Sequence, residues 1–501
     1  MRTQKALKNL IFNMIQQATA LIINFFMPPI LVSNFGSVIN GLVSTIRQIM
    51  QYVQLTGAGI AQASTYAMYK PLSENDHRTL SGIFNATKKM FRTAGNWFSI
   101  LVLLLALIYP LIIDKDVDYL TTFLLVIVIG ISGASEFYLC GKYTALLTAN
   151  QESFVVAIAQ IIGNISNLLL LVVLVHFKQN IVIVQLGMSS IYLFRILILY
   201  WYVHKHFDFI DKNEKPLFSC LSQRNDVLVH QISALVVMGS STLIVSLLLG
   251  LKEASVFSVY LIVFQGINAI CGIVSNAIYA SFGDVIVKNE RKVLLNSFSI
   301  FELAYFILIS IVFSCTFLLI MPFINLYTVN MVDANYYRPM LAVLFVIVGV
   351  ANNIRIPSTT IVNAAGHFKE TKYRAIFEMI LNVLGQFTFG KFFGLNGILL
   401  GCILSYSYRT LDFIFYTHKY ILKNSPLKSF GRIFLNLFAS VFIVMVMMYF
   451  LSPAITNYLE WIKYGFIYFV LISSFILLIN FIFERRVFLN MFNLIMGIVR
   501  K

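Results

Sequence analysis

Long runs of apolar residues alternate with short polar segments along nearly the whole chain. A helix that crosses the hydrocarbon core of a bilayer requires about 20 predominantly apolar residues. By this rule the pattern predicts about fourteen membrane-spanning helices. They cover residues 10–33, 39–67, 91–113, 119–140, 153–175, 181–203, 229–250, 255–280, 297–321, 339–365, 373–393, 396–418, 433–453 and 462–484.

The segment after residue 484 has a different pattern, because basic and apolar positions are interleaved in it. Arg485 and Arg486 begin the segment, and Arg500 and Lys501 end it. Its apolar positions are Val487, Phe488, Met491, Phe492, Ile495 and Ile498. This pattern predicts an amphipathic helix that anchors the C-terminal tail in the membrane interface.

The composition agrees with the spans and sets the class of protein. Hydrophobic residues make up 59% of the 501 residues, and charged residues only 12%, whereas soluble domains carry about 25% charged residues. So little charge cannot cover a surface that faces water. We therefore predict an all-α integral membrane protein and not a soluble enzyme. The five cysteines are scattered singly, and no metal site or cofactor is expected.

The net charge of +16 reflects the membrane topology. Of the 37 lysines and arginines, 27 lie on one side of the predicted spans, six lie on the other side and four lie within spans. Basic residues in short loops mark the cytoplasmic side, so both termini are predicted to be cytoplasmic. This distribution argues against a nucleic-acid partner.

Two pairs of spans show an internal repeat. The sixth and twelfth spans share identical residues at an offset of 214, and the second and eighth spans do so at an offset of 213. The first pair matches Gly187, Tyr192, Arg195, Leu197, Tyr202, His204 and Lys205 with Gly401, Tyr406, Arg409, Leu411, Tyr416, His418 and Lys419. The second pair matches Gly59, Ile60, Tyr66 and Ala67 with Gly272, Ile273, Tyr279 and Ala280.

The repeat unit contains six spans. Because six is an even number, both copies begin on the same side of the membrane and have the same orientation. Parallel repeats of this kind are a transporter architecture, with the substrate path between the halves near the midplane. The repeat predicts an N-terminal lobe at 1–210 and a C-terminal lobe at 211–425. The remainder, 426–501, adds two helices and the amphipathic tail.

Four arginines lie within predicted spans, at Arg47, Arg195, Arg355 and Arg409. A charge that faces lipid costs at least a few kcal/mol, so these side chains are expected to face protein or water. We predict an aqueous cavity in which their guanidinium groups bind an anionic substrate, with phosphate as the natural ligand. Arg195 lies about 14 Å along the helix from His204, so snorkelling to the interface is an alternative for it.

Carboxylates at comparable depth are fewer. Glu378 and Asp412 are candidates for coupling transport to an ion. A structural alternative remains for each: Asp412 is three residues from Arg409 and suits a self-neutralising pair, and Glu378 is one turn from Arg374. Glu136 and Glu302 complete the set.

The sequence contains no complete motif for a nucleotide site or for glycosyl transfer. Residues 385–391 contain most of a P-loop, but Phe392 stands where the magnesium-binding Ser or Thr is required. Without a nucleotide site, the energy for transport must come from an ion gradient, the membrane potential or downstream consumption of substrate. A membrane glycosyltransferase or polymerase would need a large aqueous loop with acidic residues at a recognisable spacing, and we identify none.

Several stretches resemble the polysaccharide transporter family, the lipid-linked oligosaccharide flippases (Wzx-like) of the multidrug/oligosaccharidyl-lipid/polysaccharide (MOP) exporter superfamily. They are 34–44 (NFGSVINGLVS), 68–72 (MYKPL), 146–151 (LLTANQ), and 355–358 (RIPS) with 363–369 (NAAGHFK). The resemblance extends over the whole chain through the count of fourteen spans.

The resemblance implies two six-helix lobes that form a V around a basic cavity, in the cytoplasmic membrane of a bacterium. It implies alternating access that moves an undecaprenyl-diphosphate-linked oligosaccharide to the outer leaflet for a capsule or another surface polysaccharide. We expect a monomer that works beside polysaccharide polymerase machinery.

Related functions remain as alternatives. A teichoic-acid precursor flippase would show the same sequence features. Lipid II flippases usually carry arginines in the first span, and multidrug (MATE-like) antiporters often carry a carboxylate there. The span at 10–33 has neither, which favours oligosaccharide flipping.

Overall fold

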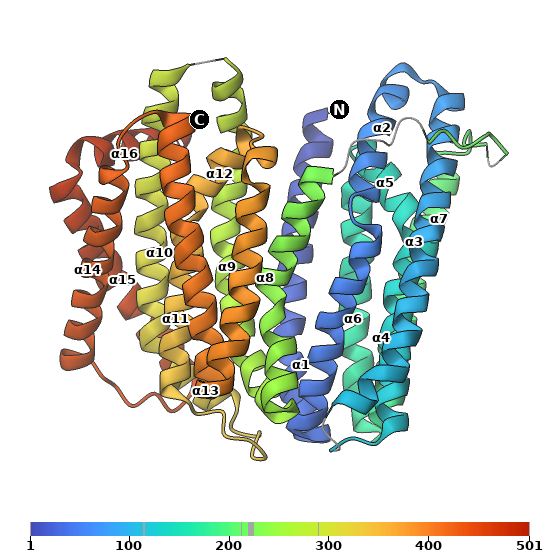
Figure 1. Ribbon diagram of the computed structural model, residues 1–501, viewed down its shortest axis with the longest axis horizontal. Helices are drawn as coiled ribbons and strands as arrows, with labels where there is room; N and C mark the ends of the chain where they lie inside the picture. Colours follow the sequence, from blue (N-terminus) through green and yellow to red (C-terminus); the bar gives the residue numbers. More distant parts are fainter. Residues whose placement is uncertain (1, 114–115, 212, 219–224, 289, 500–501) are drawn as a thin grey trace. The chain divides into compact units, whose positions relative to one another are not determined.

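Helices make up all the regular secondary structure of the described chain. The structure, a computed structural model, describes residues 2–113, 116–211, 213–218, 225–288 and 290–499. Every regular element within these ranges is helical (Figure 1), which confirms the predicted all-α class. Five basic residues used in the topology argument lie outside the described residues: Lys115, Lys212, Arg224, Arg500 and Lys501.

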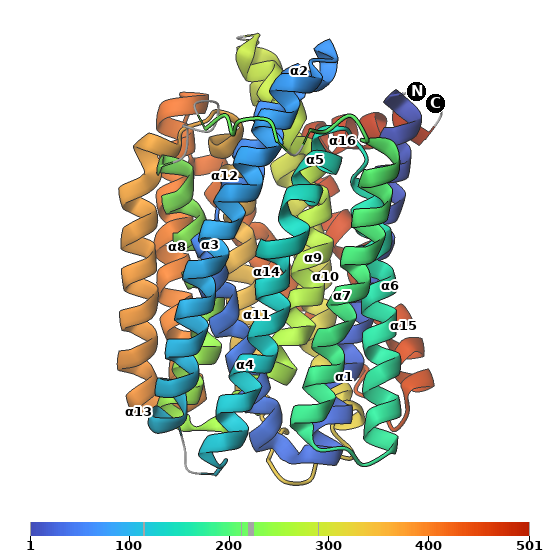
Figure 2. The same cartoon turned by 90° about the vertical axis from the view of Figure 1, so that its right-hand side faces the viewer.

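The chain divides into two compact units, Met1–Ser258 and Val259–Lys501. Unit 1 contains α1 (Arg2–Val53), η1 (Gln54–Gly57), α2 (Ile60–Glu74), α3 (His77–Ile112), α4 (Tyr119–Ser135), η2 (Glu136–Cys140), α5 (Gly141–Ala149), α6 (Ser153–His176), α7 (Ile181–His206), α8 (Asn225–Leu249) and the start of α9 (Leu251–Val287). Its long helices run side by side, with α6 against α7 and α3 against α4 (Figure 2).

Unit 2 contains the rest of α9, followed by α10 (Arg291–Tyr327), α11 (Pro339–Ile354), α12 (Ile356–Ala364), α13 (Phe368–Tyr416), η4 (Thr417–Leu422), α14 (Leu427–Phe450), α15 (Tyr458–Phe483) and α16 (Arg485–Val499). Helix α10 packs against α11, α14, α15 and α16. The predicted tail helix is present as α16, and Val487, Phe488 and Met491 pack into the same apolar cluster as Leu303 and Ile472. The side chains of Ile495 and Ile498 lie outside the described part of the chain.

The boundary between the units differs from the boundary between the predicted lobes. The units divide within α9, between Ser258 and Val259, whereas the repeat places the lobe boundary at residue 210. Packing defines the units and internal similarity defines the lobes, so α8 packs on α1 within unit 1 even though the repeat assigns it to the second lobe. The division into lobes stays a prediction.

Two of the long helices are helical hairpins joined at a glycine. Twelve stretches of the described chain are long and apolar enough to cross a membrane, and two of these, Lys8–Gly57 and Phe368–Leu422, contain 50 and 55 residues. Fifty residues of continuous helix would be about 75 Å long, far more than a bilayer requires. Gly36 (φ 84°) and Gly394 (φ 60°) break these stretches with positive φ values that glycine adopts readily. Counting each of the two as a pair of spans gives the fourteen that the sequence predicts.

The two arms of α13 pack closely through small and polar side chains. Asn382 Nδ2 donates a hydrogen bond to Ser405 Oγ at 2.7 Å, which joins the arms. One turn from this hydrogen bond, the arms come close enough that a Cβ placed on Gly401 would lie 2.4 Å from the backbone nitrogen of Gln386. Close approach of this kind is how small residues stabilise helix pairs in membranes, where the hydrophobic effect between helices is weak.

Replacing Gly401 by alanine is therefore expected to destabilise unit 2 by about 1–3 kcal/mol, because the new methyl group overlaps backbone atoms that cannot move independently. Thermal unfolding of the purified protein in detergent would show a lower midpoint. Gly431→Ala in α14 is the matched control, since a Cβ there meets nothing within 4 Å. Equal midpoints for the two variants would contradict the tight crossing.

The outward faces of the helices are apolar, as a lipid environment requires. On α14, Phe434 and Phe438 are more than 70% exposed, and Val441 and Met445 continue the same stripe at helical spacing. An apolar stripe of this kind would not be stable in water. The described chain is therefore a multi-pass membrane protein.

The basic segments predicted to share one side of the membrane lie together in unit 1. Lys5 Nζ is 2.8 Å from Glu152 Oε1, and Arg78 Nε is 3.3 Å from Glu214 Oε1. The backbone N–H of Leu217 donates to the carbonyl oxygen of Gly82 at 3.0 Å. These contacts join the N-terminus, the α2–α3 connection, the α5–α6 connection and the segment after α7 at one end of the unit.

Candidate substrate-binding arginines

Five charged side chains of unit 2 form one network, which we call the arginine cluster: Arg355, Arg374, Glu378, Arg409 and Asp412. Arg355 lies where α11 ends and α12 begins. Pro357, in the first turn of α12, lacks an N–H and cannot continue the hydrogen-bond ladder of α11. The other four residues lie on the two arms of α13.

The two carboxylates each bridge two guanidinium groups. Glu378 binds Arg355 through one oxygen, and its Oε2 lies 3.2 Å from Arg409 Nε. Asp412 Oδ2 lies 2.6 Å from Arg409 Nη1, and its other oxygen binds Arg374. Three positive and two negative formal charges therefore meet among apolar helices, and the cluster carries one excess positive charge.

The three arginines differ in their exposure. The side chain of Arg409 is only 2% exposed, that of Arg355 is 14% exposed and that of Arg374 is 37% exposed. A ligand can therefore approach Arg355 and Arg374 most easily. Arg409, between the two carboxylates, holds them in place.

Aromatic rings and an amide orient the guanidinium groups. The Arg355 guanidinium lies over the ring of Tyr406 at 4.8 Å and donates to Asn352 Oδ1 at 2.8 Å. Arg409 lies over Phe413 at 3.8 Å. Arginine stacks well on aromatic faces because its guanidinium is planar and weakly hydrated. The arginines are therefore fixed before any ligand binds.

These contacts show which side chains pair in the structural alternatives that the sequence leaves open. The Arg409–Asp412 pair exists, but it is part of a larger network and not an isolated i,i+3 pair. Among the described contacts of Glu378 are Arg355 and Arg409, whereas Arg374, one turn away along the helix, binds Asp412. The role of the cluster in substrate binding or ion coupling remains a prediction.

Sequence reasoning placed Arg374 among the cytoplasmic loop residues and missed its part in the cluster. The residue lies at the start of a predicted span, where a lysine or arginine normally marks topology. Arg374 is four residues before Glu378, and this spacing predicts that both side chains lie on the same face of the helix.

Arg47 lies in unit 1, on the second arm of the α1 hairpin. Its Nη1 is 2.6 Å from Met27 Sδ on the first arm, and its Nη2 is 3.5 Å from Gln185 Oε1 on α7. The Nε2 of Gln185 is buried and has no hydrogen-bond partner among the described residues. A buried donor without an acceptor is costly, so a guanidinium and a free amide N–H together suit an oxygen-rich ligand.

Arg195 also lies in unit 1, but its charge is neutralised. Its Nη1 binds Glu136 Oε2 at 2.7 Å, and its side chain is 11% exposed. Glu136 begins η2, a short π-helical segment between α4 and α5, so the ion pair ties α7 to that irregular turn. This pairing explains how Arg195 is held within the unit without snorkelling.

A second buried charge network attaches the last helices to unit 2. Arg432 of α14 lies 2.9 Å from Glu302 of α10 and 3.1 Å from Glu484, which directly follows α15. Asn436 and Asn480 hydrogen-bond to each other one turn further along the same helices, at 3.0 Å and 3.3 Å. Arg432 directly precedes the predicted span at 433–453 and Glu302 lies within the span at 297–321, so no spacing in the sequence relates the two. The network joins α10, α14 and the end of α15.

The guanidinium groups of the arginine cluster are occupied by carboxylates of the protein. Each carboxylate occupies guanidinium groups that could otherwise bind a phosphate. No group of three or more His, Cys, Asp or Glu side chains suited to a metal ion occurs among the described residues.

Comparison with known proteins identifies the fold. No family model matches the sequence, and no curated protein sequence matches it. An inward-facing multidrug resistance MATE family transporter of the MOP superfamily matches with a TM-score of 0.65 and 14% identity, over 83% of this chain and 97% of that chain.

Two further solved structures match over more of this chain. The lipid II flippase MurJ, in an inward closed conformation, matches with a TM-score of 0.60 and 16% identity, over 93% of this chain and 98% of that chain. A MOP superfamily transporter from Pyrococcus furiosus matches with a TM-score of 0.55 and 11% identity, over 85% and 97%. The chain therefore has the all-helical fold that these MATE, MurJ and other MOP superfamily transporters share.

Proposed function

We propose that this protein is a flippase that moves a polyprenyl-diphosphate-linked oligosaccharide across the bacterial cytoplasmic membrane. The observation that carries the proposal is the arginine cluster, in which three arginines share two carboxylates within a membrane-spanning bundle. The carrier is undecaprenyl diphosphate, the movement is by alternating access, and the product is a capsular or other surface polysaccharide.

A diphosphate is a suitable ligand for the cluster because its oxygens can accept paired hydrogen bonds from planar guanidinium groups. In the free protein Glu378 and Asp412 hold the arginines; when the substrate arrives, its head group replaces a carboxylate. Within unit 2, Arg355 and Arg374 are the contacts that the head group can reach, and Arg409 positions the carboxylates. In unit 1, Arg47 is a separate candidate for contact with the substrate. Glu378 and Asp412 are the groups through which a proton could be coupled to the exchange.

The fold is common to lipid-flipping and drug-exporting transporters, so the choice of a lipid-linked substrate rests on the arginine cluster. The MurJ structure, described as a lipid II flippase, matches over 93% of this chain with a TM-score of 0.60, and the MATE transporter matches over 83% with a TM-score of 0.65. Lipid II and teichoic-acid precursor flipping remain the second candidates, because their substrates also carry an anionic phosphate head group. The absence of arginine from residues 10–33 favours a substrate other than lipid II.

The proposal is tested by reconstituting the purified protein in liposomes that contain a fluorescent undecaprenyl-diphosphate oligosaccharide. Movement between leaflets is followed through a membrane-impermeant quencher. Wild type is expected to flip the lipid, and Arg355→Ala is expected to reduce the initial rate at least tenfold, because the head group loses one of the two guanidinium groups of the cluster that a ligand can reach. Arg78→Ala is the matched control, since Arg78 belongs to an exposed ion pair.

Two outcomes would contradict parts of the proposal. Equal rates for wild type and Arg355→Ala would remove the arginine cluster as the head-group site. If wild type flips no lipid but exports a cationic dye when a proton or sodium gradient is imposed, the protein is an antiporter.

A further inference from the structure

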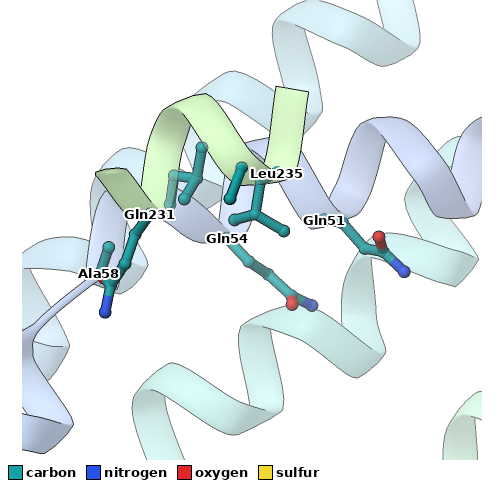
Figure 3. Close-up of a pocket in the computed structure, with 7 residues that line it drawn as sticks. Gln51, Gln54, Ala58, Gln231 and Leu235 are labelled. Carbon is teal, nitrogen blue, oxygen red and sulfur yellow. The ribbon is translucent and has the colours of Figure 1, made fainter. Parts of the chain in front are cut away.

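A cavity of about 610 Å³ in unit 1 is lined by three glutamines and four apolar residues, and none of the described residues that line it is charged. It lies where α1 continues into η1, opposite the first turns of α8 (Figure 3). Gln51 and Gln54 project from the first segment, and Gln231 and Leu235 project from α8. The volume is within the range of about 300–1,000 Å³ that is usual for small-molecule sites.

The spacing of the lining residues shows two helical faces turned toward each other. On the α1–η1 segment they are Gln51, Gln54, Leu55 and Ala58, at i, i+3, i+4 and i+7. On α8 the lining positions are 231, 234 and 235, at i, i+3 and i+4. Residues at these intervals share one face of a helix. The glutamines are therefore directed into the cavity by the helix register.

Most of the hydrogen-bonding capacity of these glutamines is unused by the protein. Gln51 accepts one bond from Gln48 at 3.2 Å, and Gln231 donates one to Gln62 at 3.2 Å. The side chain of Gln54 makes no hydrogen bond within the part of the chain that the structure describes. Each carboxamide offers two N–H donors and a carbonyl oxygen with two lone pairs. Contacts between helices use only a small part of these donors and acceptors.

The chemistry of the cavity suits a neutral polyol. A sugar hydroxyl both donates and accepts hydrogen bonds, and a carboxamide does the same. Among its described lining residues the cavity has no charged side chain that would favour an ion over a neutral ligand. Leu55 and Leu235 supply apolar surface for the C–H face of a sugar ring.

We propose that this cavity, which we call the glutamine pocket, binds a neutral sugar of the lipid-linked oligosaccharide. The inference rests on the proposed function, because that function supplies a substrate with a saccharide. The glutamine pocket belongs to unit 1 and recognises hydroxyl groups, whereas the arginine cluster belongs to unit 2 and recognises charge. Each can therefore be removed without the other.

The test measures binding of neutral glycosides that carry no phosphate. The probes are octyl β-glucoside, octyl β-galactoside and octyl β-N-acetylglucosaminide, and an octyl oligo-oxyethylene without sugar is the reference. Thermal protection of the full-length protein in nanodiscs is titrated below the micelle concentration of each probe. We expect at least one glycoside to protect wild type more strongly than the reference does. We expect Gln54→Leu/Gln231→Leu to weaken that binding at least tenfold.

Controls separate this site from the folding of the protein and from the proposed function. Gln179→Leu is the matched glutamine control, because Gln179 lies in the exposed turn between α6 and α7. The double glutamine variant should still bind undecaprenyl diphosphate without sugar, which shows that it is folded. Arg355→Ala should keep its glycoside affinity while it loses flipping.

Equal glycoside affinity in wild type and the double variant would overturn the pocket, as would protection by no glycoside beyond the sugar-free reference. If wild type does not flip lipid but glycoside binding depends on the glutamines, the proposed function fails and the sugar site stands.

Discussion

Removing both negative charges from the arginine cluster, with Glu378→Gln and Asp412→Asn together, is expected to destabilise the protein by about 3–5 kcal/mol. The substitutions keep the size and much of the hydrogen bonding of both side chains. They leave three guanidinium groups without an acidic partner in the cluster, and the side chain of Arg409 is only 2% exposed. An uncompensated charge at that depth has neither water nor a counter-ion to stabilise it. Thermal unfolding of the purified variant would show the loss as a lower midpoint.

A third substitution distinguishes loss of charge balance from simple damage to packing. Adding Arg409→Met to the double variant removes the most buried positive charge and should recover a large part of the lost stability. Glu214→Gln, in the exposed pair with Arg78, is the control and should unfold like wild type. A double variant as stable as wild type would show that the carboxylates do not balance the buried arginines.

The single substitution Glu378→Gln is expected to tighten binding of the substrate and slow its transport. Glu378 is bound to Arg355 in the free protein, so the carboxylate and the substrate diphosphate compete for the same guanidinium. Neutralising the competitor should raise affinity about tenfold, equivalent to about 1.4 kcal/mol. Tighter binding in the ground state makes release slower, so turnover should fall.

Affinity is measured in nanodiscs with the fluorescent undecaprenyl-diphosphate oligosaccharide, and turnover is measured in liposomes. Glu136→Gln provides the matched control within a span, since it releases Arg195 of unit 1 and leaves the arginine cluster intact. Unchanged or weaker affinity in Glu378→Gln would show that this carboxylate does not occupy the substrate position.

The pattern of apolar residues was sufficient to predict the helices and their number. The span at 10–33 lies in the first arm of α1, and those at 373–393 and 396–418 follow the two arms of α13. The span at 39–67 was predicted too long, because the second arm of α1 ends at Val53 and the chain continues through η1 and a break at Gly59 into α2. Hydropathy marks spans well because every backbone polar group in a bilayer must be satisfied within its own helix. Gly36 and Gly394 lie between predicted spans, and the chain reverses direction at each of them.

Counting charges within spans also identified most of the arginine cluster, but the pairings depend on tertiary packing. Glu378 is 23 residues from Arg355, and Asp412 is 38 residues from Arg374. No periodicity in one helix relates such positions. Arg374 and Arg432 were assigned to loops because a basic residue at the edge of a span normally marks topology.

The glutamine pocket gave no signal in the sequence. A glutamine on an apolar helix is equally consistent with a contact between helices, and only the packing of α8 against the end of α1 shows that Gln51, Gln54 and Gln231 line the same pocket.

The central claim, that this protein moves lipid substrates through recognition of their anionic head group, is tested most directly with two matched lipids. Both carry the same polyprenyl chain and the same fluorescent oligosaccharide; one has a diphosphate linkage and the other a neutral ether linkage. Their movement between leaflets is compared in liposomes that contain wild-type protein. The account predicts rapid, protein-dependent flipping of the diphosphate lipid and little movement of the neutral lipid. Equal flipping of both lipids, or flipping of neither, would contradict it.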